Sequence, residues 1–412
     1  MRVLLSAYAC EPNRGSEPEV GWQRALHTLA YADEVWVLTR SNNKTAIEAN
    51  SLSYSPGLHF IYFDLPQWAL RIKRQWWFRP IYFIWWQWGA YCQAAKDHRD
   101  TPFDGVYHVT FTSMQFGSFM GRLGIPFVIG PIAGGECAPM RLRRGMPMRC
   151  KVRELLRDFG ILLQRYSPLT RQAYAAAKHI YVTTPESLRL VPRKWHSKTT
   201  VHLAIAMPGY AVQDERRRLP SFPRFVFIGR LLHWKGAHFA IQALAEVRRT
   251  VPAATLTLVG GGPDEHWLRD MAKRHGVANS VDFTGYLPQQ RIASMLRGYT
   301  ALVYPSLHDS GGLVVLEALA AGLPVICLDL GGPGVIVNQS CGIVVPTADA
   351  NEGQTITGIA NAMISLWLLS DAESAKLRTE AVTRANELSW NRLTEHIAER
   401  AVPPKDRVIE RG

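Results

Sequence analysis

Short apolar runs alternate with helical patterns along almost the whole chain. In the first half, such runs predict strands at residues 3–7, 34–38, 59–63, 105–109, 126–129 and 179–183. A second series predicts strands at residues 224–228, 255–259, 281–284, 301–304, 324–328 and 342–345. Continuous Val, Ile and Leu runs between helices are typical of parallel sheets covered on both faces. The pattern therefore predicts an α/β protein with two doubly wound, Rossmann-like domains.

The length of the chain agrees with this division, because 412 residues exceed one typical core. Residues 208–223 are polar, rich in Pro and free of helical or strand period, so we expect the linker there. In open parallel sheets, ligands bind beyond the carboxyl ends of the strands. We therefore expect the residues that bind a ligand to lie where the predicted strands end.

The balance of charge and the cysteines narrow the class of protein. The formal net charge is +13, which favours anionic partners such as nucleic acid, an anionic membrane face or phosphorylated small molecules. The six cysteines form no CxxC pair, which argues against zinc and for reduced thiols in a cytoplasmic protein. The apolar runs are short, so we expect neither a transmembrane helix nor a signal peptide.

One segment in the second half combines a strand end, two glycines and a helix start. Residues 308–322 read HDSGGLVVLEALAAG, with Gly311 and Gly312 between Asp309 and Glu317. Such a turn exposes the free N–H groups of the first helical turn, and the helix dipole favours an anion there. Glu317 falls about one turn further in, where its carboxylate can accept bonds from sugar hydroxyls. The alternative is an ordinary strand–loop–helix with a solvated Asp309 and a packed Glu317.

Two cations flank an earlier strand-to-helix turn. Gly229 and Arg230 end the strand at 224–228, and Lys235 leads into the next helix. Arg can bind phosphate oxygens in a fork and Lys acts as a compact point charge, so the pair suits a diphosphate. The alternative is a pair of ordinary surface cations. After the strand at 281–284, Tyr286 is placed to lie against a base.

Two features of the first half point to the same edge of its sheet. Gly15 and Ser16 lie between the first strand and the first helix, where their amides can face a ligand, and Ser16 also fits a helix cap before Pro18. His108 is predicted to close the fourth strand, and a histidine at a strand end faces a ligand more often than one in mid-strand. The alternatives are a simple helix cap and a histidine satisfied within the core.

Two stretches have the composition of membrane-surface segments. Residues 71–88 place Arg and Lys beside five Trp, and residues 141–157 are dense in Arg and Lys. Basic residues beside Trp and Tyr are typical of interfacial segments, and clustered cations attract anionic lipid. The alternatives are an aromatic helix packed into a core, and a solvated or phosphate-binding basic face.

Together these motifs resemble the GT-B fold glycosyltransferases of the retaining family 4. That family shows a Gly-Arg…Lys-Gly segment and a Glu-x7-Glu motif before an Ala-x-Ala-x-Gly-x-Pro-Val-Ile run. The segments at 229–236 and 309–326 match in order and spacing. The resemblance implies two Rossmann-like domains facing across a cleft: an acceptor-binding domain at 1–207 and a nucleotide-sugar-binding domain at 224–388. Residues 389–412 would cross back to the first domain.

The resemblance also implies roles in the second domain. Arg230 and Lys235 would bind the donor diphosphate. The backbone amides of Gly312 and Leu313 would bind its distal phosphate, and Glu317 would bind the ribose of the nucleotide. Developing charge on the leaving phosphate would be stabilised electrostatically by these groups. No Asp-x-Asp motif occurs, so we expect transfer without a metal ion.

The sugar itself would lie between further residues of both domains. Asp309 would contact the transferred sugar, His108 would lie beside it, and Gly15 and Ser16 would face the donor. Two departures from the family leave the donor sugar open: Asp309 stands where Glu is usual, and Gly311 where an aromatic residue is common.

The implied function is transfer of a sugar, with retention, from a nucleotide sugar to a saccharide or polyprenyl-linked acceptor, as in bacterial surface polysaccharide synthesis. The nucleotide sugar is a substrate, and no cofactor or nucleic acid is expected. We expect a cytoplasmic protein that can bind the inner face of an anionic membrane through residues 71–88 and 141–157. A sugar-nucleotide epimerase of the same fold is the alternative; a nucleic-acid-binding protein and a non-catalytic membrane scaffold are remoter ones.

Overall fold

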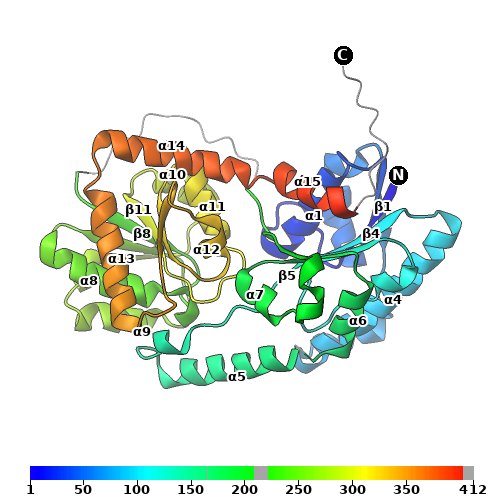
Figure 1. Cartoon of the computed structure of the whole chain (residues 1–412), viewed down its shortest axis with the longest axis horizontal. Helices are drawn as coiled ribbons and strands as arrows, with labels where there is room; N and C mark the ends of the chain where they lie inside the picture. The colour runs from blue at the N-terminus through cyan, green and yellow to red at the C-terminus, as the bar shows by residue number, and fades with distance from the viewer. Residues whose placement is uncertain (165, 208–220, 402–412) are drawn as a thin grey trace, which may run out of the picture. The chain divides into compact units, whose positions relative to one another are not determined.

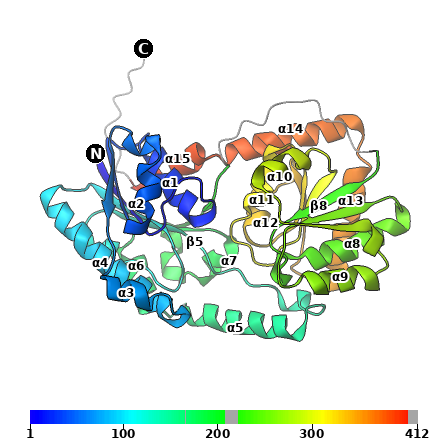
Figure 2. The ribbon, with the colours of Figure 1, turned by 180° about the vertical axis from the view of Figure 1, so that it is seen from behind.

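The chain divides into two compact units (Figures 1 and 2). The computed structural model describes residues 1–164, 166–207 and 221–401. The first unit comprises residues 1–135 and 160–205 and the segment that begins at Trp390, and the second comprises residues 136–159 and 206–389. Most of the predicted linker, residues 208–220, lies outside the described residues.

A parallel sheet of seven strands forms the centre of the first unit, in the order β3-β2-β1-β4-β5-β6-β7. The strands are β1 (Arg2–Ala7), β2 (Glu34–Thr39), β3 (Leu58–Tyr62), β4 (Gly105–Thr110), β5 (Phe127–Ile132), β6 (His179–Val182) and β7 (Thr199–Val201). The helices are α1 (Ser16–Thr28), α2 (Lys44–Glu48), α3 (Gln67–Ile72), α4 (Arg79–Asp100), α6 (Pro168–Ala176), α7 (Pro185–Leu190) and α15 (Trp390–Ala401). Six of the strands were predicted. Strand β7 was not predicted, because it is short and mostly Thr.

The second unit repeats this plan with six parallel strands in the order β10-β9-β8-β11-β12-β13. They are β8 (Arg224–Ile228), β9 (Thr255–Val259), β10 (Val281–Gly285), β11 (Ala301–Tyr304), β12 (Val325–Leu328) and β13 (Gly342–Val345). The helices are α8 (Ala237–Thr250), α9 (Glu265–Arg274), α10 (Gln289–Leu296), α11 (Leu313–Ala320), α12 (Gly331–Ile336), α13 (Glu352–Trp367) and α14 (Asp371–Glu387). The predicted α/β class with two Rossmann-like sheets is confirmed.

Helices cover both faces of the second sheet. Helix α8 packs against α9 and α13, whereas α11 packs against α10, α12 and α14 (Figure 1). The strands between them are almost entirely buried, which explains why each reads as a continuous apolar run. In the first unit, α15 packs against α1, and both views show the two helices side by side (Figures 1 and 2).

Helix α5 (Met148–Gln164) starts in the second unit. Residues 136–159 were predicted to lie in the first domain, whereas they cluster with the second unit. The physical reason is a set of polar contacts from α5: Glu154 accepts a hydrogen bond from His233, and Arg149 pairs with Asp264. None of these partners is near α5 in the sequence, so periodicity alone could not reveal them.

The aromatic segment at 71–88 is divided between core and surface. Tyr82, Phe83 and Trp86 of α4 lie in the hydrophobic core of the first unit, whereas Trp85 and Trp88 are exposed. The core interpretation therefore holds for the buried side chains of this segment, and the membrane interpretation stays a prediction for the exposed ones. No helix in the described ranges is long and apolar enough to cross a bilayer.

Candidate functional site

The candidate site of the second unit lies where its strand order reverses. Strands β8 and β11 are neighbours although they are not consecutive, and the chain leaves them in opposite directions across the sheet. Arg230 and Lys235 follow β8, and Asp309 follows β11. Such a switch point, at the carboxyl ends of the strands, leaves the crevice in which open α/β sheets bind ligands.

Three side chains meet in a triangle at this point. The Lys235 ammonium donates to the Tyr304 hydroxyl at 2.7 Å and to Asp309 Oδ2 at 2.6 Å, and the Tyr304 hydroxyl donates to the same oxygen at 2.7 Å. Burial would raise the pKa of Asp309, but Lys235 and Tyr304 outweigh burial and hold this pKa below its ordinary value. Asp309 is therefore ionised, and Lys235 is held in place by it.

Beside the triangle, α11 begins with a glycine that adopts a left-handed backbone. Gly312 is the cap residue, with a φ of 76°. The N–H groups of Gly312 and Leu313 donate to no acceptor within the described ranges, while the Gly311 N–H donates to Asp309 Oδ1 at 3.3 Å. The start of α11 thus presents unused N–H donors together with the positive end of the helix dipole. This arrangement can bind an anion.

Glu317 lies one turn further along α11. Its Oε1 accepts a hydrogen bond from Gln289 of α10 at 2.8 Å. Burial raises the pKa of Glu317, and the bond from Gln289 opposes this shift. A half-buried carboxylate with one free oxygen can accept bonds from the hydroxyls of a ligand.

The other predicted residues of this unit remain apart from the triangle. Gly229 follows β8 with a φ of 154°, and the Arg230 side chain is exposed and bonded to no described residue. Tyr286 is 84% exposed and follows β10. The structure therefore brings Lys235, Asp309 and the start of α11 together, and leaves Arg230 and Tyr286 available to a ligand.

Two details of the first unit differ from the sequence interpretation. Gly15, with a φ of 62°, is the cap of α1, so Ser16 is the first helical residue and not the cap. His108 does not close its strand, because β4 continues to Thr110. The ring is fully buried, with Nδ1 2.9 Å from Ser6 Oγ and Nε2 3.4 Å from Gln87 Nε2, and burial lowers its pKa to about 4.

A buried polar cluster next to the triangle was missed altogether. Glu154 Oε1 lies 2.9 Å from Nε2 of His233 and 3.1 Å from Nε2 of His308. The two histidines closely precede Lys235 and Asp309 in the sequence, and that proximity was the available signal. Tyr304 and Gln289 were also missed, because each acts through a contact that only the fold creates.

One group of side chains could be considered for a metal ion. Ligand atoms of Cys150, His233 and Asp264 lie within 4.8 Å of one another. Asp264, however, already accepts hydrogen bonds from the His233 backbone N–H at 2.8 Å and from Arg149 at 3.0 Å. The nearby guanidinium opposes a second cation, and we assign no metal to this group.

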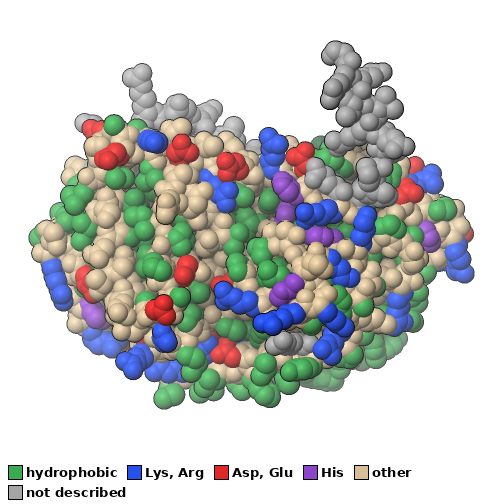
Figure 3. Space-filling model, in the orientation of Figure 1, with side chains coloured by type: hydrophobic (Ala, Val, Ile, Leu, Met, Phe, Trp, Pro, Cys, Tyr) green, Lys and Arg blue, Asp and Glu red, His purple; other side chains and the backbone are tan. Residues whose placement is uncertain are grey.

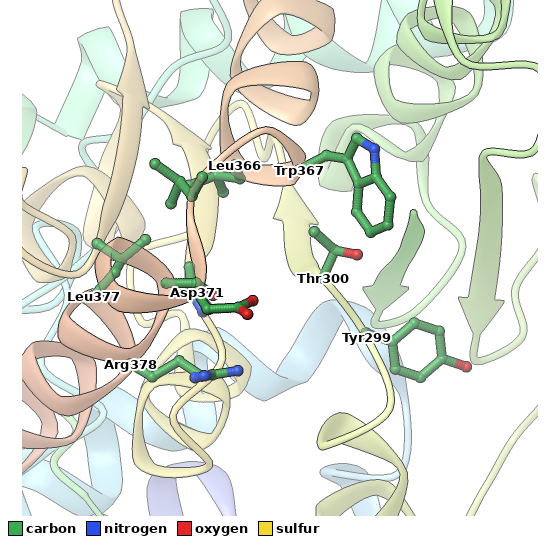
Figure 4. A pocket seen from close by; sticks show the side chains of 10 residues that line it. Tyr299, Thr300, Leu366, Trp367, Asp371, Leu377 and Arg378 are labelled. Atoms are coloured by element: carbon green, nitrogen blue, oxygen red, sulfur yellow. The ribbon is translucent and has the colours of Figure 1, made fainter. Parts of the chain in front are cut away.

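A separate cavity lies at the other edge of the same sheet. It has a volume of about 230 Å³ and is lined by Tyr299, Trp367, Asp371 and Arg378 among others (Figure 4). Thr300 and Pro324, which directly precede β11 and β12, also line it. The cavity is therefore at the amino ends of the strands and cannot receive a ligand bound by Lys235 and α11.

The sequence profile described as "Glycosyl transferases group 1" matches residues 213–365, which include the triangle and α11. Over these residues the chain is similar to the glycosyl transferases group 1 family. This match lies on the second unit, as the motifs of the resemblance do. The first unit lies outside the matched range.

Curated relatives match over part of the chain. Glycogen synthase from Mycobacterium tuberculosis is 34% identical over 178 residues, which are 42% of this chain and 41% of the relative. A GDP-mannose-dependent alpha-(1-6)-phosphatidylinositol monomannoside mannosyltransferase from the same species is 33% identical over 165 residues, which are 38% of this chain and 41% of the relative. The chain thus spans about two fifths of the length of these relatives.

Solved structures match over nearly the whole length. HepE from Anabaena, in complex with UDP and glucose, superposes with a TM-score of 0.56 at 15% identity, covering 97% of this chain and 98% of that one. At this identity the likeness shows the fold alone. The two sheets are those of a GT-B glycosyltransferase fold.

Proposed function

We propose that the protein is a glycosyltransferase that moves a sugar from a nucleoside-diphosphate sugar to a saccharide or lipid-linked acceptor, with retention and without a metal ion. The observation that supports this most is the Lys235–Tyr304–Asp309 triangle beside the unused N–H groups at the start of α11. A cation and bare main-chain donors at a sheet switch point form a site for a diphosphate.

In the proposed reaction the leaving group is a nucleoside diphosphate. Bond breaking builds negative charge on its distal phosphate, and Lys235, Arg230 and the start of α11 stabilise that charge. Asp309, already oriented by Lys235 and Tyr304, accepts hydrogen bonds from the hydroxyls of the sugar. Glu317 holds the ribose. These groups supply electrostatic stabilisation from the protein itself, and activity should therefore survive a chelator.

The comparisons also suggest classes of donor and acceptor. The HepE structure contains UDP and glucose, and the name of the mannosyltransferase gives GDP-mannose as donor and a phosphatidylinositol mannoside as acceptor. We therefore propose UDP- or GDP-sugars as donors. For the acceptor we propose a saccharide or polyprenyl-linked glycan of a bacterial surface polysaccharide, used by a cytoplasmic protein that binds peripherally to the inner membrane face.

The test is a thermal-unfolding screen with UDP-glucose, GDP-mannose and other nucleotide sugars, followed by product analysis. A ligand at 100 times its Kd stabilises the protein by ~2.7 kcal/mol, so a true donor raises the melting temperature clearly. The positive donor is then incubated alone. A new epimer formed without acceptor would contradict transfer and support the epimerase alternative.

Substitutions in the triangle separate donor binding from stability. Lys235→Met removes the cation and leaves the Asp309 carboxylate without an ion-pair partner, so we expect a loss of about 3 kcal/mol in the free energy of unfolding and no donor response. The double variant Lys235→Met with Asp309→Asn removes both charges. It should regain most of the stability in urea unfolding but still show no donor-induced rise in melting temperature. Donor stabilisation of the double variant equal to that of the natural protein would refute the role of Lys235.

A further inference from the structure

The outward face of α5 is apolar. Its exposed apolar side chains in the second unit lie mostly three or four residues apart, so they share one side of the helix. These side chains are between 47% and 72% exposed: Met148, Val152, Leu155, Leu156 and Phe159. The space-filling view shows hydrophobic side chains gathered along α5 (Figure 3). A helix that packs on a protein core normally shows the opposite arrangement.

The inward face of α5 is held by polar contacts. Glu154 lies on that face and is 3% exposed, and its Oε1 accepts bonds from both His233 and His308. Arg149 pairs with Asp264 at 3.0 Å. Burial would raise the pKa of Glu154, but the two histidines outweigh burial and lower it. These bonds fix the rotation of the helix about its axis and keep the apolar side chains outside.

Cations border the apolar face on both sides. At roughly 100° per residue, Arg153 falls on one flank and Lys151 on the other. Arg144 is exposed just before the helix. The acidic residues of the described part of α5 are engaged elsewhere: Glu154 with the histidines, and Asp158 with Arg143 at 2.6 Å. The outward side of the helix is therefore apolar at its centre and positive at its edges.

We propose that α5 docks the protein onto an anionic lipid bilayer, lying in the plane of the interface with Leu155, Leu156 and Phe159 among the acyl chains. The positive edges then contact lipid headgroups. A second copy of the chain fits less well, because like charges on the two helices would meet. This proposal extends the membrane part of the proposed function, but lipid binding itself requires neither a donor nor transfer.

The same helix is bonded to the loops of the candidate site. His233 is two residues before Lys235, and His308 directly precedes Asp309. Glu154 holds both histidines, so docking through α5 places the donor-binding loops next to the lipid surface. A lipid-borne acceptor would then be presented close to the site where the diphosphate leaves.

Flotation with vesicles tests the proposal. The full chain should float with vesicles of phosphatidylglycerol and phosphatidylcholine, less with phosphatidylcholine alone, and less as salt rises. The double variant Leu155→Glu with Leu156→Glu should stay at the bottom of the gradient. Lys151→Ser with Arg153→Ser should lower the partition coefficient about 30-fold, which is ~1 kcal/mol for each charge. The matched control is Leu368→Glu, an exposed leucine outside α5, and it should float as the natural protein does.

Three results would overturn the proposal. The first is a natural protein that does not float with anionic vesicles, and the second is a Leu155/Leu156 variant that floats as well as the natural protein. The third is a concentration-dependent dimer in light scattering that only the α5 substitutions break, because a second copy would then be the occupant. Circular dichroism checks that the variants are folded. The thermal response to UDP-glucose or GDP-mannose is measured separately, so loss of lipid binding and loss of donor binding are distinguished.

Discussion

His108 illustrates how the chemistry of a residue depends on where its strand ends. Because β4 continues beyond it, the ring lies inside the sheet, between Ser6 and Gln87, and is fully buried. Burial lowers its pKa from 6.5 to about 4, so the folded protein holds it neutral. The unfolded chain binds a proton more readily below pH 6.5, and stability must therefore fall as the pH drops from 6.5 toward 4.

We expect the substitution His108→Gln to remove this loss of stability at low pH. In the natural protein the buried ring costs about 3 kcal/mol of the free energy of unfolding between pH 7 and pH 4. Urea unfolding at several pH values measures the difference between protein and variant. The same substitution at the exposed His275 is the control. An unchanged pH slope in the His108 variant would show that the ring is not held neutral by burial.

Residues of the candidate site that belong to a sequence motif could be predicted, whereas residues that join the site only through tertiary contacts could not. Lys235, Asp309 and Glu317 were predicted as site residues because glycines and charged residues recur at characteristic distances along the chain. Tyr304 reads as one more buried strand residue, yet its hydroxyl bonds both Lys235 and Asp309. Its role depends on two partners that the sequence does not place beside it.

At the scale of elements, the start of α11 depends on one backbone conformation. Gly312 has a positive φ of 76°, and a Cβ there would come within 3.2 Å of Pro333 Cγ. Only glycine takes this conformation without strain, and the tight packing adds a second penalty for any side chain. The strand–glycine–helix pattern predicted the turn, whereas the crowding against α12 is visible only in the fold.

The substitution Gly312→Ala should therefore lower the free energy of unfolding more than an alanine does at an uncrowded position with positive φ. Gly276 has a φ of 70° and open space around its Cα, so Gly276→Ala is the matched control. We expect backbone strain to lower the free energy of unfolding of the control by ~1 kcal/mol. Contact with Pro333 should lower that of Gly312→Ala by about 1–2 kcal/mol more. Thermal unfolding measures both. Equal losses would mean that Pro333 gives way without cost.

At the scale of the whole molecule, the last described helix, α15, belongs to the first unit. The residues directly before it, 206–389, belong to the second unit. Trp390 of α15 is 6% exposed and lies over the guanidinium of Arg24, which is fully buried in α1, at 5.2 Å. Arg24 also donates to Thr394 at 3.1 Å. A cation this deep requires such partners, so α15 completes the first unit.

Trp390→Ala should accordingly destabilise the first unit. Removing a buried Trp costs about 3–5 kcal/mol and here also uncovers the buried Arg24. Calorimetry should show a transition moved to lower temperature. Trp68→Ala, at an exposed position of α3, is the control and should change little. A Trp390 variant as stable as the control would mean that α15 contributes little to the first unit.

The sequence alone determined the features that repeat locally. Apolar runs of strand length predicted both sheets, and glycine and charge spacing predicted the turn before α11 and the cations after β8, because backbone preference and side-chain period act over a few residues. Tertiary structure decided which side of α5 faces outward, that His108 is enclosed, and that Lys235 pairs with Asp309. Each of these depends on partners far away in the sequence, and burial and charge pairing arise only when the fold brings them together.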